Sequence, residues 1–180
     1  MSVHVFVDES RRNDTYLLAA AIVIPSDLRR LRTLLRGLLL PGQRELHFKK
    51  ETPQRRRAVL SQLSQAGARV AVYRRSCSEG PEAARQACLA RLTADVLELN
   101  ASRLALDSRE DRDVLDVRTI RAGLGKFPRA ALLAYEHLNA VSEPLIWIAD
   151  AVAWSYGAGG DWARRVEGIV VRIVRLDESP

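Results

Sequence analysis

Two apolar segments near the start of the chain constrain the fold more than any other feature of the sequence. Val3 to Val7 is rich in β-branched residues, and the segment from Tyr16 to Ile24 contains no charged residue. A polar, turn-like stretch from Arg11 to Asp14 separates them. An uncharged run of this kind is typical of a strand buried on both faces, and the short polar connection predicts a hairpin.

The rest of the sequence predicts two helices and then alternating strands and helices. The two helices are expected over residues 26–38 and 52–67, where cap residues and prolines bound amphipathic segments. Three strand–helix units are expected next, with strands at 69–76, 103–107 and 131–137 and helices at 81–100, 113–124 and 142–157. Residues 167–176 fit a C-terminal helix or an edge strand, and their Val and Ile content favours the strand. This order predicts an α/β fold with a mixed sheet, helices on both faces and a two-helix insertion after the second strand.

Length and charge limit the class of protein. A chain of 180 residues suits one domain, residues 1–180, with a single sizeable core. The net charge is +6, from 28 basic and 22 acidic residues, and most of the basic residues are Arg. Because the guanidinium group matches phosphate geometry, a nucleic-acid partner is expected.

Several arginine clusters are candidates for contacts with nucleic acid. They are Arg29, Arg30 and Arg32 on the first predicted helix and Arg55, Arg56 and Arg57 on the second. The alternative is that these are the ordinary charged faces of solvent-exposed helices. The sequence has no aromatic stacking motif for single strands, so base readout is not expected.

The cysteines and the apolar runs indicate the cellular environment. Cys77 and Cys88 are the only cysteines, and their number and spacing predict free thiols rather than a disulfide framework or a zinc site. The longest apolar runs are shorter than the roughly 20 residues that a membrane-spanning helix needs. We therefore expect a cytoplasmic protein with no membrane partner.

Acidic residues follow or interrupt the apolar segments at three places. Asp8 and Glu9 directly follow the first strand, and Asp107 ends a later one. Asp150 is the one charged residue between Leu145 and Tyr156. Phosphodiester hydrolysis can use two Mg²⁺ or Mn²⁺ ions about 4 Å apart, and Mg²⁺ prefers carboxylate oxygens from separate elements. Asp8, Asp107 and Asp150 are therefore predicted metal ligands, although an acid after a strand is also a common turn residue.

Asp150 gives the strongest of these signals. Residues on both sides of its predicted helix are apolar, so the carboxylate is expected to be buried. A buried carboxylate costs several kcal/mol unless a cation or another partner compensates it. Either a metal ion or an arginine would satisfy this requirement.

Other polar residues are candidates for the same site. Leu46 and Phe48 are expected to anchor a short extended segment, which leaves Glu45 and His47 on its other side. Glu9 either binds a metal or faces solvent. His137, expected just beyond a strand, is either a proton carrier or a loop residue.

Taken in order, these segments resemble the bacterial family of domains of unknown function numbered 3800. The matching pieces are Val5-Phe6-Val7-Asp8-Glu9-Ser10, the strand from Tyr16 to Ile24, Glu45-Leu46-His47, the strand ending in Asp107, and Ser142, Pro144 and Ala149-Asp150. The resemblance covers Met1 to about Gly157. Two positions depart from the family's pattern, because Arg11 stands where Gly is usual and Ile148 where Gln is common.

The resemblance implies a ribonuclease H-like fold with about five strands and acids that converge at one edge of the sheet. It implies that Asp8, Asp107 and Asp150 bind metal, with Glu45 or Glu9 as a fourth carboxylate and His47 or His137 nearby. The expected function is a Mg²⁺- or Mn²⁺-dependent nuclease, or a related phosphodiester-cleaving enzyme.

Two other functions share features with this sequence. The alternative from a different class is a non-catalytic nucleic-acid- or protein-binding module with a degenerate site. A phosphohydrolase of the haloacid-dehalogenase kind is set aside, because its nucleophilic Asp is followed two residues later by a second Asp, and here Ser10 occupies that position.

Overall fold

A six-stranded mixed sheet forms the centre of the computed structural model, which describes residues 2–125 and 132–177. The strands lie in the order β5-β4-β1-β2-β3-β6. Their bounds are β1 Val3–Arg12, β2 Thr15–Val23, β3 Val70–Ser76, β4 Ala101–Asp107, β5 Ala134–Leu138 and β6 Val170–Arg175. β2 is antiparallel to both β1 and β3, whereas β4, β5 and β6 join the sheet in parallel pairings.

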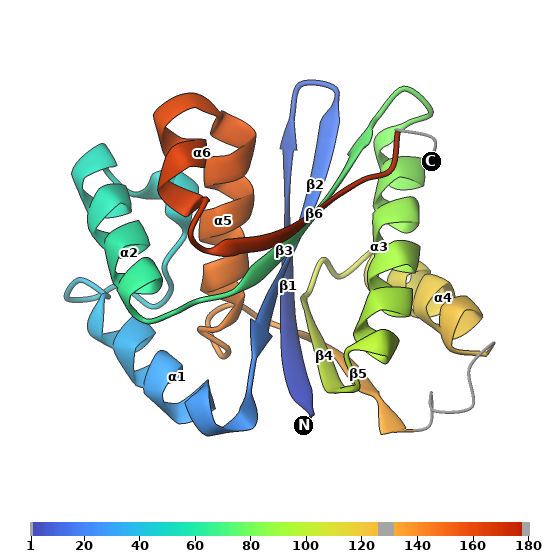
Figure 1. Ribbon diagram of the computed structural model, residues 1–180, viewed down its shortest axis with the longest axis horizontal. Coiled ribbons are helices and arrows are strands. Elements are labelled where there is room, and N and C mark those ends of the chain that lie inside the picture. The colour runs from blue at the N-terminus through green and yellow to red at the C-terminus, as the bar shows by residue number, and fades with distance from the viewer. Residues whose placement is uncertain (1, 126–131, 178–180) are drawn as a thin grey trace.

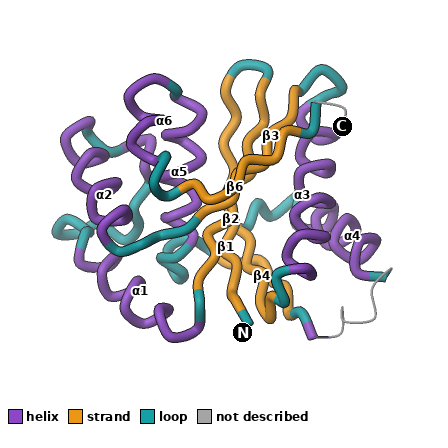
Figure 2. The backbone as a smooth tube through the Cα atoms, in the orientation of Figure 1, coloured by secondary structure: helices purple, strands orange, loops and turns teal. Residues whose placement is uncertain are grey.

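Helices cover both faces of this sheet (Figure 1). The helices are α1 Leu28–Gly37, α2 Pro53–Gln65, α3 Pro81–Glu98, α4 Asp113–Leu124, α5 Ile146–Ala158 and α6 Gly160–Val166, with short 3₁₀ turns η1 Pro25–Asp27 and η2 Phe48–Lys50. α1, α2, α5 and α6 lie on one side of the sheet, and α3 and α4 lie on the other (Figures 1 and 2).

The alternation of side chains along the strands produces two apolar cores. Phe6 on β1 and Leu17 on β2 are buried among the side chains of α1, α2 and α5. Val7 and Leu18, their neighbours in sequence, are buried on the α3 and α4 side. Successive residues of a strand point to opposite faces, so an uncharged strand such as β2 is required between two helical layers.

The structure confirms the predicted class, the opening hairpin and the two-helix insertion between β2 and β3. Residues 170–175 form the edge strand that their composition favoured, which brings the sheet to six strands. α5 contains Asp150, as expected. Both cysteines are buried free thiols.

Some local features were not predicted. The segment around Glu45 is anchored by the buried Leu46 and Phe48, as expected, but it continues into the 3₁₀ turn η2, which the sequence did not indicate. β5 is an outer strand of the sheet, and its predicted start at Ala131 lies outside the described residues. α6 was not predicted, because the glycines before it indicated only the end of α5; Gly159 in fact turns the chain with φ +70° and a new helix follows. In the described part of the chain, no helix is both long and apolar enough to cross a membrane.

Candidate active site

The sheet places two of the predicted aspartates on neighbouring strands. Val7 of β1 is paired with Leu106 of the parallel strand β4, so Asp8 and Asp107 are the next residues on each strand. Phe6 and Ala105, two residues earlier, are buried on the face that α5 covers. By the two-residue period of a strand, Asp8 and Asp107 lie on that same face.

Helix α5 contributes the third aspartate from across this face. Asp150 accepts a hydrogen bond from the backbone N–H of Phe48, with 2.8 Å between nitrogen and Oδ2. Phe48 is fully buried, so this bond fixes the loop before η2 against α5. The loop thereby brings Glu45 and His47 to the same place.

These side chains surround one cavity of about 360 Å³. Asp8, Asp107, Asp150, Glu45 and His47 all line it. They come from β1, β4, α5 and the loop before η2, which are far apart in the sequence. The gathering of distant carboxylates that the sequence predicted is therefore present in the fold.

Burial and neighbouring carboxylates raise the pKa of the carboxyl groups in this cavity. Burial raises the pKa of Asp8 well above its usual range, and the nearby Asp150 and Asp107 carboxylates raise it further. Burial also raises the pKa of Asp150 and of Asp107. The hydrogen bond from Phe48 opposes the rise in the pKa of Asp150.

None of these three aspartates forms an ion pair with a lysine or arginine of the described residues, whereas other buried acids of this chain do. Nδ1 of His47 is likewise buried, with no hydrogen-bond partner in the described part of the chain. Partly buried carboxylates that form no direct ion pair fit a hard divalent metal ion. The donor set of the cavity therefore suits Mg²⁺ or Mn²⁺.

Glu9 also lines the cavity, but its carboxylate has a different environment. Its carboxylate is 2.7 Å from Nη1 of Arg109 and 3.1 Å from Nε of Arg85, and it accepts a hydrogen bond from the hydroxyl of Tyr16. It belongs to the α3 face of β1, opposite to Asp8. These partners already neutralise Glu9, so Glu45 is the better fourth carboxylate.

Arg109 and two neighbouring polar residues were not predicted from the sequence. Arg109, Ser108 and Asn139 also line the cavity. Glu9 holds the Arg109 guanidinium, and Arg109 lowers the pKa of Asp8 and Asp107. The order of β4 and β5 could have indicated them, because Ser108 and Asn139 directly follow the ends of these adjacent strands.

His137 lies elsewhere, within β5. Its Nε2 is 3.1 Å from Oδ2 of Asp116, and Asp113, Asp116 and His137 bring possible ligand atoms within 4.8 Å of one another. No other such compact group of three occurs among residues 2–125 and 132–177. However, Nη2 of Arg85 is 2.8 Å from Oδ2 of Asp116. The guanidinium of Arg85 thus already compensates negative charge in this cluster.

The predicted nucleic-acid-binding arginines divide into two groups. Arg30, Arg32 and Arg55 form ion pairs with Asp27, Glu143 and Glu51. Arg56 donates to the backbone carbonyls of Phe48 and Lys49, and Arg29 and Arg57 are exposed. Much of the predicted cluster therefore stabilises the two-helix insertion.

Comparison with known proteins supports the fold. No protein-family model matches the chain, and no curated protein matches it significantly, so membership of the family numbered 3800 stays a prediction. Among solved structures, the chain is similar to one described as the structure of the PCNA:RNase HII complex from Archaeoglobus fulgidus. The TM-score is 0.55 at 20% sequence identity, over 84% of this chain and 69% of that chain. The chain therefore has an α/β, ribonuclease H-like fold.

Proposed function

We propose that the protein is a divalent-metal-dependent nuclease, or a closely related phosphodiester-cleaving enzyme, and that it acts on nucleic acid in the cavity of Asp8, Asp107 and Asp150. One observation carries the proposal. Three carboxylates from separate elements line one cavity, and none forms a direct ion pair with a lysine or arginine of the described residues. The fold, shared with a structure that contains a ribonuclease, agrees with this function.

Each residue of the cavity has a proposed role. Asp8, Asp107 and Asp150 would hold Mg²⁺ or Mn²⁺, with Glu45 as the fourth carboxylate. The bound metal would supply Lewis-acid stabilisation of the charge that develops on the phosphate. Arg109, whose guanidinium is fixed by Glu9, would bind a phosphate oxygen at the rim. His47, which lines the cavity, would accept or donate a proton.

The proposed site would hold two ions about 4 Å apart, each about 2.1 Å from its oxygens. The three aspartates are not among the groups of described residues whose ligand atoms all lie within 4.8 Å of one another.

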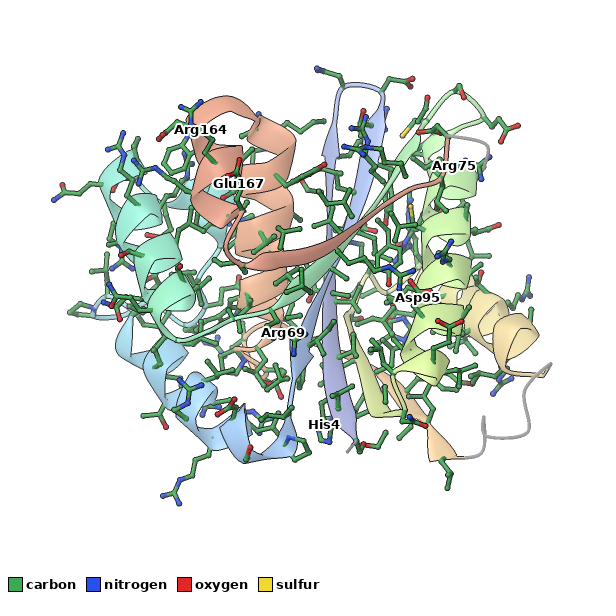
Figure 3. All side chains as sticks on the ribbon, viewed as in Figure 1. His4, Arg69, Arg75, Asp95, Arg164 and Glu167 are labelled. Atoms are coloured by element: carbon green, nitrogen blue, oxygen red, sulfur yellow. The ribbon has the colours of Figure 1, made fainter. Side chains whose placement is uncertain are left out.

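A cleavage assay tests the proposal. Labelled single- and double-stranded DNA and RNA would be incubated with the protein in Mg²⁺, in Mn²⁺ and in EDTA. We expect metal-dependent cleavage that Asp8→Asn and Asp107→Asn reduce by at least 100-fold, since each removes a metal ligand. Glu167→Gln removes a negative charge from an exposed site at the end of α6 and is the matched control (Figure 3). Metal-dependent cleavage that survives both aspartate substitutions would refute the proposed site.

The alternative is a non-catalytic binding module. It predicts nucleic-acid binding but no cleavage by the wild-type protein, and binding that Asp8→Asn leaves unchanged in the presence and absence of metal.

A further inference from the structure

A second cavity, of about 620 Å³, has the opposite charge to the acidic one. We call it the basic groove, and its charged and aromatic lining residues are Arg11, Arg12, Lys49, Arg56 and Trp154. No Asp or Glu of residues 2–125 and 132–177 lines it. The groove lies between the tip of the β1–β2 hairpin, at the upper edge of Figure 2, and the segment from η2 to α2.

Three cations of the basic groove have no acidic partner among the residues that the structure describes. Arg12, Lys49 and Arg56 form no ion pair with any acid in the described part of the chain. This distinguishes them from Arg30, Arg32 and Arg55, whose charges are compensated. Three uncompensated cations at one cavity attract an anion from outside the protein.

The Trp154 ring contacts two of these cations, the guanidinium groups of Arg12 and Arg56. The Arg56 guanidinium lies 4.1 Å from the Trp154 ring centroid, and the Arg12 guanidinium lies 4.9 Å from it. Stacking on an aromatic ring orients a guanidinium without using its N–H donors. Arg56 uses Nε and Nη2 for backbone carbonyls, which leaves Nη1 for a ligand. Because guanidinium groups already cover the ring, Trp154 serves to orient cations rather than to stack bases.

The basic groove and the acidic cavity are lined by residues of the same elements, β1 and α5. Asp8, Ser10 and Arg12 follow one face of β1, so Arg12 lies about 13 Å along the strand from Asp8. Trp154 is one helical turn after Asp150, on the same face of α5. The backbone of Phe48 links the two sites, because its N–H donates to Asp150 and its carbonyl accepts from Arg56.

We propose that the basic groove binds the sugar–phosphate backbone of the nucleic-acid strand beside the phosphate that is cut in the acidic cavity. This inference rests on the proposed nuclease function and identifies how the substrate is held. Phosphate oxygens match oriented guanidinium donors, and contacts to the backbone carry no base specificity. The groove would therefore position a strand without selecting its sequence.

The test is a binding measurement that does not depend on cleavage. Fluorescein-labelled 20-nucleotide DNA and RNA strands of one sequence, and their duplexes, would be titrated with Asp8→Asn protein in EDTA by fluorescence anisotropy. The groove variant adds Arg12→Ala and Lys49→Ala, two partly or fully exposed residues whose loss leaves the Arg56 anchor intact. The charge-matched control adds Arg69→Ala and Arg118→Ala, both exposed and outside the groove. Arg69 lies at the other end of the sheet from the hairpin tip (Figure 3). Circular dichroism would verify that each variant is folded.

Loss of two phosphate contacts should weaken single-strand binding roughly 10- to 30-fold at 0.1 M salt and make the slope of log K against log salt shallower by about 1.4. The control pair should change neither quantity as much. The DNA and RNA arms identify which strand is the ligand. Equal effects of the two pairs, or unchanged binding by the groove variant, would overturn the inference. Cleavage by the wild-type protein is measured separately, so failure of the nuclease proposal is distinguished from failure of the groove.

Discussion

Arg32 offers a test of whether the arginines of α1 act on a ligand or within the fold. Arg32 donates from Nε and Nη2 to both oxygens of Glu143, at 3.0 and 2.6 Å. The Glu143 side chain is only 7% exposed, and one of its oxygens also accepts the N–H of Leu145, immediately before α5. Arg32→Ala would leave this buried carboxylate without its cation.

The expected cost follows from this geometry. Removing one partner of a buried ion pair typically costs about 3–5 kcal/mol. The Arg32 side chain is 26% exposed, and Glu143 keeps its hydrogen bond from Leu145. We therefore expect Arg32→Ala to lower the free energy of unfolding by about 2–3 kcal/mol. In a chain of this size, that lowers the melting temperature by about 4–12 °C.

Thermal and urea unfolding of Arg32→Ala would measure this loss, with Arg29→Ala as the control. Arg29 is exposed on the same helix, and its replacement should change stability by less than about 0.5 kcal/mol. Adding Glu143→Gln to Arg32→Ala should recover part of the loss, since the uncompensated charge is then absent. Equal, small effects of Arg32→Ala and Arg29→Ala would refute the structural role of Arg32.

Two further predictions concern Asp8 in the acidic cavity and Gly157 on α5. Because burial and Asp150 raise the pKa of Asp8, the folded state keeps this proton to higher pH than the unfolded chain, so ionised Asp8 destabilises the metal-free protein. We would measure the free energy of unfolding of Asp8→Asn and of the wild-type protein in urea with EDTA. The variant should be more stable than wild type by an amount that grows as pH rises from about 4 towards neutrality. A difference in stability that shrinks as pH rises would contradict this. A Cβ at Gly157 would lie 2.8 Å from Cδ1 of Leu17 and 3.2 Å from Cγ of Arg12. Overpacking of about 1–3 kcal/mol should outweigh a helix-propensity gain of about 1 kcal/mol, so Gly157→Ala should be destabilising in the same assay. Gly37→Ala should not be destabilising, because its added Cβ has no atom within 4 Å. Equal stability of the two variants would count against the close contact at Gly157.

Most of the fold could be predicted from the sequence, because local patterns of apolar residues define its strands. The uncharged run that became β2 needed two apolar layers, and those layers are present. The acids at the ends of β1 and β4 were visible as breaks in apolar strands. Their meeting with Asp150 required only that β1 and β4 be neighbours and that α5 cover them.

Side-chain partners were less accessible to sequence reasoning, because they depend on long-range packing. Nothing near Arg32 in the sequence indicates its pairing with Glu143, 111 residues later. The same holds for His137, which turns towards Asp116 within β5 rather than towards the acidic cavity. The stacking of Arg12 and Arg56 on Trp154 joins three separate elements, so the basic groove could be recognised only in the fold.

The most direct test of the metal-dependent site is anomalous scattering from crystals of the wild-type protein soaked in Mn²⁺. We expect two peaks about 4 Å apart inside the acidic cavity, bound by oxygens of Asp8, Asp107 and Asp150. Manganese bound at Asp113, Asp116 and His137 with none at the three aspartates, or no ordered manganese in the cavity at saturating concentration, would contradict the account.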